Sequence, residues 1–349
     1  MKKEQDLYRN LITDMGKTGF LIRDLIHGVP YSERGMSVPS VLKDAYSRNA
    51  DNIAEEFAVE KLTKFSQKNN DLPIRIIVNP NTPTIVDIGD VSKNRVIWSY
   101  LDVVDGTIKV AGLGSENNIY RIGNDGLWGS GFAFTTLTEK KLEELTIGDF
   151  TNSIITDGNP SKYHHSPTNA FSISTNNKET FELLEDYNCI QHEIGSLIRL
   201  TTSSQTNIGQ GAILFDGFQG FDRNTASSNA EELNYAIYKT ISNRNEGGAF
   251  DVWRSYGTLC EIMRGMLWYG EKGLEAQGVA AIRMNDHLAN AIPPYAIFTN
   301  AGGFITDFDG NDLGKSLITA GRPNSIYSAN EIVKDYLVDK MQEVTKLVG

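Results

Sequence analysis

The chain contains the stretch Val96-Ile97-Trp98-Ser99-Tyr100-Leu101, which runs directly into Asp102-Val103-Val104-Asp105-Gly106-Thr107. β-Branched and aromatic residues favour a strand, and two acids, a glycine and a hydroxyl follow where that strand would turn. Carboxylate oxygens suit hard divalent cations, while Gly106 lets the backbone bend and present N–H groups to an anion. The stretch therefore predicts a strand ending in a metal-phosphate site. A solvated turn is the plainer alternative, because Asp and Gly are common turn residues.

Apolar periodicity predicts helices at 4–27, with a break near Gly16 or Gly19, and at 38–67. Residues 150–178 are rich in Asn, Ser, Thr and Pro and are expected to be loop around one short strand. Helices first, strands next and a mixed second half predict an α+β or layered α/β fold. The expected strands are 75–78, 84–88, 95–101, 129–136, 171–174, 212–215, 279–283 and 304–307. The further expected helices are 228–241, 257–268 and 286–300. A capping box at 328–331 predicts one more helix at the C-terminus.

The formal net charge of −11 argues against a partner that is a nucleic-acid polymer, because such proteins normally present a basic face. Acidity also repels a phosphorylated substrate at long range. Divalent cations held by carboxylates would reverse the field locally, so the charge fits a metal-dependent enzyme better than a metal-free one.

The two cysteines, Cys189 and Cys260, form no CxxC pair, so neither a zinc site nor a disulfide framework is expected. The first residues carry charge without a following apolar run, so no signal peptide is predicted. No apolar run approaches the length that spans a membrane. A cytoplasmic protein with no membrane partner is expected.

Four blocks of sequence, between residues 40 and 315, resemble the inositol monophosphatase family in the expected order. Residues 102–107 are similar to the family signature D-P-x-D-G-T, and Arg254-Ser255-Tyr256-Gly257-Thr258 resembles its R-x-x-G-S. Residues 285–290 together with 300–310 are similar to W-D-x-A…A-G-G-x-x-T-D-x-x-G, and residues 50–56 to the acidic N-terminal helix of microbial members. The family comprises Mg-dependent, often lithium-sensitive phosphatases of inositol, sugars and nucleotides. Fructose-1,6-bisphosphatase-like and 3′-nucleotidase members belong to the same superfamily.

The resemblance implies a layered αβαβα sandwich with two subdomains, 1–185 and 186–349, and a site between them. It also implies a homodimer and two or three Mg²⁺ ions, for which Mn²⁺ can substitute. The metal ligands implied are Asp102, Asp105, the carbonyl of Val104, and Asp286 from the second subdomain. From the sequence itself, an acid at the start of the 286–300 helix is favoured by the helix dipole, and a plain N-cap is the alternative for Asp286.

Further roles follow from the same resemblance. Thr107 would polarise the attacking water together with an acid, and the N–H groups of Gly106 and Thr107 would hold the phosphate. Gly257 and Thr258 would contact the substrate, and Asp51 would lie near Thr107. His287 stands where adenosine 3′,5′-bisphosphate phosphatases of the family often have a histidine.

The chain also departs from the family pattern. Val103 replaces a proline, Asn285 replaces a tryptophan, and residues 108–128 exceed the usual spacing, as either a substrate-capping insertion or a surface loop. The Glu-Glu pair that precedes the signature is missing. Asp87 has about the right separation from Asp102 to replace it, with Asp90 as second choice.

The expected function is a Mg²⁺-dependent hydrolase of a small inositol, sugar or nucleotide phosphate, acting through metal-activated water. The alternative is a degenerate relative that binds a phosphorylated ligand or a partner without turnover. The missing Glu-Glu pair and Asn285 favour the alternative, whereas the retained aspartates and Thr107 favour the enzyme.

Overall fold

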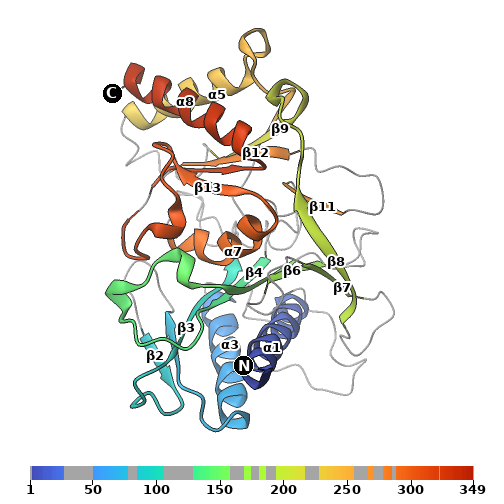
Figure 1. Cartoon of the computed structure of the whole chain (residues 1–349), viewed down its shortest axis with the longest axis vertical. Helices are drawn as coiled ribbons and strands as arrows, with labels where there is room; N and C mark the ends of the chain where they lie inside the picture. Colours follow the sequence, from blue (N-terminus) through green and yellow to red (C-terminus); the bar gives the residue numbers. More distant parts are fainter. Residues whose placement is uncertain are drawn as a thin grey trace.

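A computed structural model describes residues 2–26, 50–77, 85–105, 129–157, 169–173, 181–185, 194–216, 228–254, 266–269, 278–284, 288–321 and 323–348. These residues form five stacked layers in which helices alternate with sheets (Figure 1). The outer layers are α1 (Lys2–Ile26) with α3 (Ala50–Lys68), and α5 (Ser228–Ser242) with α8 (Glu331–Val348). The middle helix is α7 (Ile292–Asn300). The expected αβαβα sandwich is confirmed.

Two sheets separate these helical layers, one of nine strands and one of five. In spatial order the first contains β11 (Leu267–Tyr269), β8 (Ile194–Thr202), β7 (Phe181–Glu185), β6 (Asn169–Ile173), β5 (Asn152–Asp157), β4 (Gly129–Phe134), β3 (Ile97–Asp105), β1 (Ile74–Ile77) and β2 (Ile85–Ile88). The second contains β10 (Asp251–Arg254), β9 (Ala212–Asp216), β12 (Gly278–Arg283), β14 (Ser325–Ser328) and β13 (Phe304–Asp307). Short 3-10 helices are η2 (Leu142–Glu144), η3 (Ile147–Asp149), η4 (Ile208–Gln210), η5 (Arg244–Glu246), η6 (Leu288–Ala291) and η7 (Leu313–Lys315).

Strand β3 is buried on both faces, which explains its nearly continuous apolar sequence. Ile97, Leu101 and Val103 join the cluster formed with α1 and α3. Trp98 and Tyr100, on the opposite face, join the cluster between the two sheets. The period of two in a strand thus assigns each residue of β3 to one of two cores.

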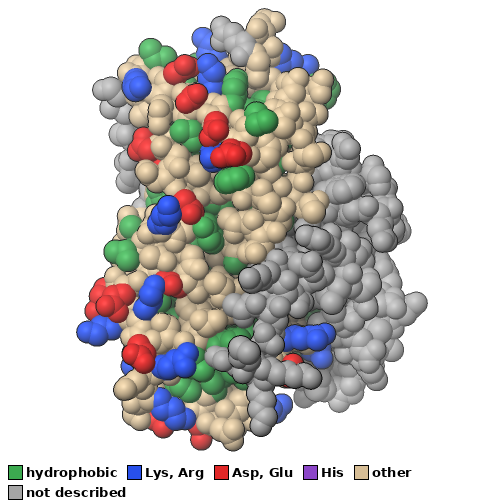
Figure 2. All heavy atoms as spheres, in the orientation of Figure 1, with side chains coloured by type: hydrophobic (Ala, Val, Ile, Leu, Met, Phe, Trp, Pro, Cys, Tyr) green, Lys and Arg blue, Asp and Glu red, His purple; other side chains and the backbone are tan. Residues whose placement is uncertain are grey.

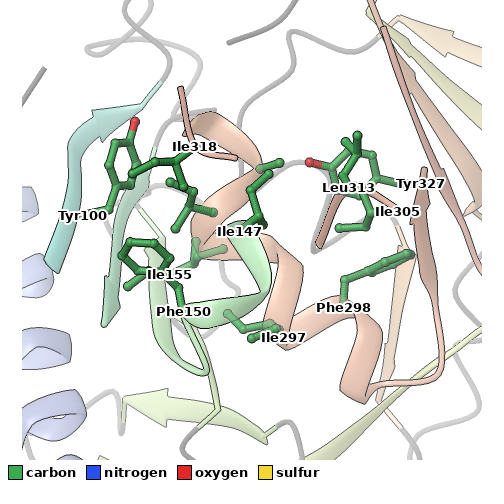
Figure 3. Packing of buried hydrophobic residues seen from close by; sticks show 14 of the residues in the cluster. Tyr100, Ile147, Phe150, Ile155, Ile297, Phe298, Ile305, Leu313, Ile318 and Tyr327 are labelled. Atoms are coloured by element: carbon green, nitrogen blue, oxygen red, sulfur yellow. The ribbon is translucent and has the colours of Figure 1, made fainter. Parts of the chain in front are cut away.

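The core between the sheets joins the two halves of the chain (Figure 3). Tyr100 comes from β3, and Ile297 and Phe298 come from α7. Phe298 and Tyr327 pack edge to face with ring centroids 5.7 Å apart. A single core therefore fixes the first sheet, α7 and the second sheet relative to one another.

Helix α1 runs without interruption through Gly16 and Gly19, so the predicted break is wrong. Both glycines allow close approach of α1 to β5. A Cβ atom on Gly16 would lie 2.6 Å from the Ile154 side chain, and one on Gly19 would lie 2.1 Å from the Thr156 hydroxyl. The glycines serve packing rather than a turn.

The region expected to be mostly loop contains the whole of β5, and β6 begins earlier than predicted. Its polar residues are buried because they bond to neighbouring backbone. The hydroxyl of Ser153 donates to the carbonyls of Phe132 and Pro293, at 3.1 and 2.6 Å. Strands β7 and β8 were not predicted, and the end of the predicted 257–268 helix is wrong because Leu267 and Trp268 lie in β11.

The division between the sheets does not fall at the predicted boundary of 185 and 186. Both β8 and β11 come from the second half of the chain, yet they complete the first sheet beyond β7. The first sheet therefore needs residues from both expected subdomains.

Among the described residues, no helix is both long and apolar enough to cross a membrane. Acidic and basic side chains are interspersed over the described part of the face shown in Figure 2. The net negative charge is not gathered into one patch on that part of the surface.

Candidate metal and phosphate site

Strand β3 continues through both acids of the signature and does not end at Leu101 as predicted. Asp102 is opposite Gly131 of β4 and Asp105 is opposite Gly129, so the register shifts between them. Three steps along β3 match two steps along β4, which defines a β-bulge. Positions 102 and 105 would fall on opposite faces of a regular strand. The bulge brings both positions to the same face.

That face is the one toward the middle layer. Position 102 shares it with Trp98 and Tyr100, which pack in the core between the sheets. The two positions paired with the acids are the buried glycines Gly129 and Gly131, which carry no side chain to fill the space beside them. The hydroxyl of Ser130, between these glycines, donates to the carbonyl of Val103 at 2.6 Å and so anchors the bulge.

The donor set at this bulge fits a hard divalent cation. Asp102 is partly exposed, and the backbone of Val104 and Asp105 belongs to β3. Carboxylate and carbonyl oxygens are the ligands that Mg²⁺ prefers. Gly106 and Thr107 lie outside the described residues, as do the side chains at 104 and 105. Within the described part of the chain, no group of three or more His, Cys, Asp or Glu could hold a metal ion.

Asp87 is not placed to complete this site. It pairs with Arg75 of β1, and Arg75 pairs with Trp98 of β3, four residues before Asp102. With about 4.8 Å between strands and about 3.3 Å per residue, the Cα atoms of Asp87 and Asp102 are roughly 16 Å apart. Asp87 is exposed and forms an ion pair with Arg75 at 3.2 Å. The structure therefore does not bring Asp87 to the acids of β3.

Asp90 is further still from the acids of β3. Strand β2 is antiparallel to β1, so its later residues move toward the amino end of β3. The N–H of Asp90 donates to the carbonyl of Asp71, at 3.2 Å. A hydrogen bond from the Ser92 hydroxyl lowers the pKa of Asp90. Asp90 is a surface acid at the opposite end of the sheet, so the structure does not bring it to the acids of β3 either.

A third donor from this part of the chain would be expected after β1, which is parallel to β3 and ends beside it. The chain leaves β1 at Ile77 and continues as Val78-Asn79-Pro80, with no carboxylate. An acid directly after β1 would lie near Asp102 and Asp105, but the sequence has no acid there.

The first turn of α3 contains Asp51, whose side chain is outside the described residues. Helix α3 leads through a short turn into β1, so its amino end lies over the carboxyl ends of β1 and β3. Ala54 packs in the same cluster as Val103, which agrees with this direction. The element that carries Asp51 thus begins at the end of the sheet where Asp105 lies.

The second-half candidates follow the carboxyl ends of parallel strands, where ligands commonly bind in α/β sheets. Strands β10 and β12 flank β9 and are both parallel to it. Gly257 and Thr258 follow β10, and Asp286 and His287 follow β12; all four are outside the described residues.

The helical segment expected at 286–300 is described from Leu288 onward. Helix α7 begins at Ile292, its N-cap is Ala291, and proline occupies its first turn. The preceding η6 begins at Leu288, so the residue before it is His287. Ala291 and not Asp286 is therefore the N-cap of α7, and Asp286 itself lies outside the described residues.

A buried ion pair that sequence analysis missed lies at the same edge of the second sheet. Asp216 ends β9, Arg283 ends β12, and the two are paired in register. The Arg283 Nε atom is 3.8 Å from Oδ2 of Asp216, and both side chains are 3% exposed. In the sequence, the signal for this pair is one charged residue at the end of each of two apolar strands. The pair joins the two strands just before the chain continues to Asp286.

The last block of the resemblance forms turns that shape the fold. Gly302 has a φ of 102° and follows α7, and a Cβ atom on Gly303 would lie 2.3 Å from the Phe298 ring. The Asp307 carboxylate accepts the N–H groups of Asp309 and Asn311, at 2.9 and 2.8 Å. These residues end α7 and close the turn after β13.

Comparisons with known proteins agree with this architecture. No protein-family model matches the chain, and no curated protein matches it. Among solved structures, it is similar to Leishmania major fructose-1,6-bisphosphatase in holo form, with 14% identity, a TM-score of 0.60 and coverage of 99% of this chain and 94% of the other. The Thermotoga maritima IMPase matches with 12% identity, a TM-score of 0.55 and coverage of 95% and 97%.

The extragenic suppressor protein suhB from Bartonella henselae matches with 12% identity, a TM-score of 0.53 and coverage of 95% and 99%. At these identities the likeness establishes the fold. It spans nearly the whole of each protein, so it includes both sheets and all three helical layers. The chain therefore has the fold of the inositol monophosphatases and fructose-1,6-bisphosphatase.

Proposed function

We propose that the protein is a Mg²⁺-dependent phosphate monoester hydrolase that acts on a small inositol, sugar or nucleotide phosphate. The observation that carries the proposal is the bulge in β3, which brings positions 102 and 105 to one face beside two glycines. The fold supports it, because the structural neighbours include phosphatases.

In this proposal Asp102, Asp105, the carbonyl of Val104, and Asp286 hold the ions. When bound, Mg²⁺ supplies activation of a water molecule and neutralisation of charge on the phosphoryl oxygens. Gly106 is the residue at which the backbone can approach the phosphate closely.

Other residues of the proposal act on the water and the substrate. The Thr107 hydroxyl orients the attacking water, and the N–H groups of Gly106 and Thr107 bind the phosphoryl oxygens. Gly257 and Thr258 contact the part of the substrate beyond the phosphate. His287 also contacts the substrate, as expected if that substrate is a nucleotide.

A second candidate function is binding of a phosphorylated ligand without turnover. It is favoured by the position of Asp87 and Asp90 away from the site and by the absence of an acid directly after β1. Asn285 in place of tryptophan agrees with it.

The enzyme proposal is tested by measuring phosphate release from a panel of inositol, sugar and nucleotide phosphates during a Mg²⁺ titration. Asp105→Asn is expected to lower kcat by at least about a hundredfold, because a neutral amide binds the cation weakly. Glu60→Gln is the control, since Glu60 is exposed on α3 and pairs with Lys64. Ligand binding with no phosphate release at any Mg²⁺ concentration would favour the binding protein.

We further propose that the protein is a cytoplasmic homodimer. The dimer is supported by the resemblance of the sequence, and the compartment by two cysteines with no disulfide framework. Light scattering coupled to size exclusion tests the dimer, and an elution at 38.6 kDa would contradict it.

A further inference from the structure

The proposed site lacks a carboxylate that its chemistry needs, and the strand register of the first sheet brings another acid to it. Neither Asp87 of β2 nor Asp90 after it lies near the bulge, and no acid follows β1 directly. Asp157 is the last residue of β5 and pairs with Gly129. Gly129 pairs on its other side with Asp105.

The row Asp105, Gly129 and Asp157 therefore crosses three adjacent strands at one edge of the sheet. Position 157 belongs to the same face as Ile155, which packs in the core between the sheets. That is the face shared by positions 102 and 105. The residue between the two positions is Gly129, which has no side chain, and the side chains of Asp105 and Asp157 are outside the described residues.

The spacing suits a site with two ions. Two inter-strand steps of about 4.8 Å put the Cα atoms of Asp105 and Asp157 about 10 Å apart. Two aspartates at this separation on one face of a sheet could hold divalent cations between them. The same arithmetic excludes Asp87, at roughly 16 Å from Asp102.

We propose that Asp157 is a carboxylate ligand of the divalent-cation site and takes the place of the missing acid before the signature. This inference rests on the proposed function, because it assigns one more ligand to the same site. Asp102 and Asp105 would then be ligands from β3, and Asp157 would be a ligand from β5 on the other side of Gly129.

The test compares Mn²⁺ binding by wild type, Asp157→Asn and Asp87→Asn in an equilibrium titration followed by electron paramagnetic resonance. Asp157→Asn is expected to weaken Mn²⁺ binding by at least about tenfold, the loss that even an indirect partner of a ligand causes. Asp87→Asn is the matched control, with the same change of charge on an exposed residue of the same sheet. Equal affinities for the two variants overturn the assignment.

A second measurement uses the wild-type protein and so does not depend on the folding of a variant. Fe²⁺ bound in place of Mg²⁺, with ascorbate and dissolved oxygen, cuts the backbone close to the metal. Cuts are expected near residues 102–107, near residue 157 and near Asp286. Cuts near the other proposed ligands but not near residue 157 overturn the role of Asp157.

The two proposals fail in different ways. If the wild type binds Mn²⁺ and releases phosphate while Asp157→Asn behaves as Asp87→Asn does, the proposed function stands and the ligand assignment is wrong. If wild type neither binds Mn²⁺ nor is cut by bound Fe²⁺, the metal site itself is wrong, and both proposals fall.

Discussion

At the residue scale, loss of the ion pair between Asp216 and Arg283 is expected to lower stability strongly, because both charges are buried. The pair lies at the ends of two neighbouring strands of the second sheet. Breaking a buried ion pair costs several kcal/mol, since one charge remains without its partner. An exposed pair costs much less, because water already screens its charges.

Asp216→Asn is therefore expected to lower the free energy of unfolding by about 3 kcal/mol or more. Asp87→Asn, which breaks the exposed pair with Arg75, is expected to lower it by less than about 1 kcal/mol. Urea denaturation followed by circular dichroism measures both. A similar loss in the two variants would show that the Asp216 pair is not energetically distinct.

The element scale shows what local sequence patterns can predict in this protein. The end of α7 just before Gly302 and the strand after it were predicted correctly because glycine and apolar patterns act locally. The extension of β3 through Asp105 was not, since a bulge depends on the register with β4. The two acids of the signature were predicted from the motif, whereas Asp87 was predicted by counting residues, which ignores that β2 is antiparallel to β1.

Helix α1 offers a matched pair of tests at this scale. Replacing glycine by alanine inside a helix usually stabilises it by about 1 kcal/mol. At Gly16 the new Cβ meets the Cδ1 end of Ile154, which can move, so Gly16→Ala is expected to be neutral or stabilising.

At Gly19 the new Cβ would lie 2.1 Å from Oγ1 of Thr156 and 2.9 Å from its Cβ, which cannot move without the strand. Gly19→Ala is therefore expected to lower the free energy of unfolding by about 1–3 kcal/mol. Thermal unfolding of both variants measures the difference. A Gly19→Ala protein as stable as Gly16→Ala would contradict close packing of α1 on β5.

At the scale of the whole molecule, the fold is held together by the core between the sheets. That core contains Tyr100 and Ile155 of the first sheet, Ile297 of α7 and Tyr327 of the second sheet. Motifs from both halves of the chain therefore depend on one packed interior, which a search for domain boundaries in the sequence could not reveal.

A fragment of residues 1–185 is expected not to fold alone, although it contains the whole D-x-x-D-G-T motif. It lacks β8, which pairs with β7, and α7, which covers the middle face of β4 and β5. Loss of α7 exposes Trp98 and Tyr100, and the open edge of β7 invites aggregation. Circular dichroism and urea unfolding of the purified fragment measure this, with the full chain as control. A cooperative unfolding transition for the fragment would mean that the first sheet is stable without the second half, and that 1–185 is an independent folding unit after all.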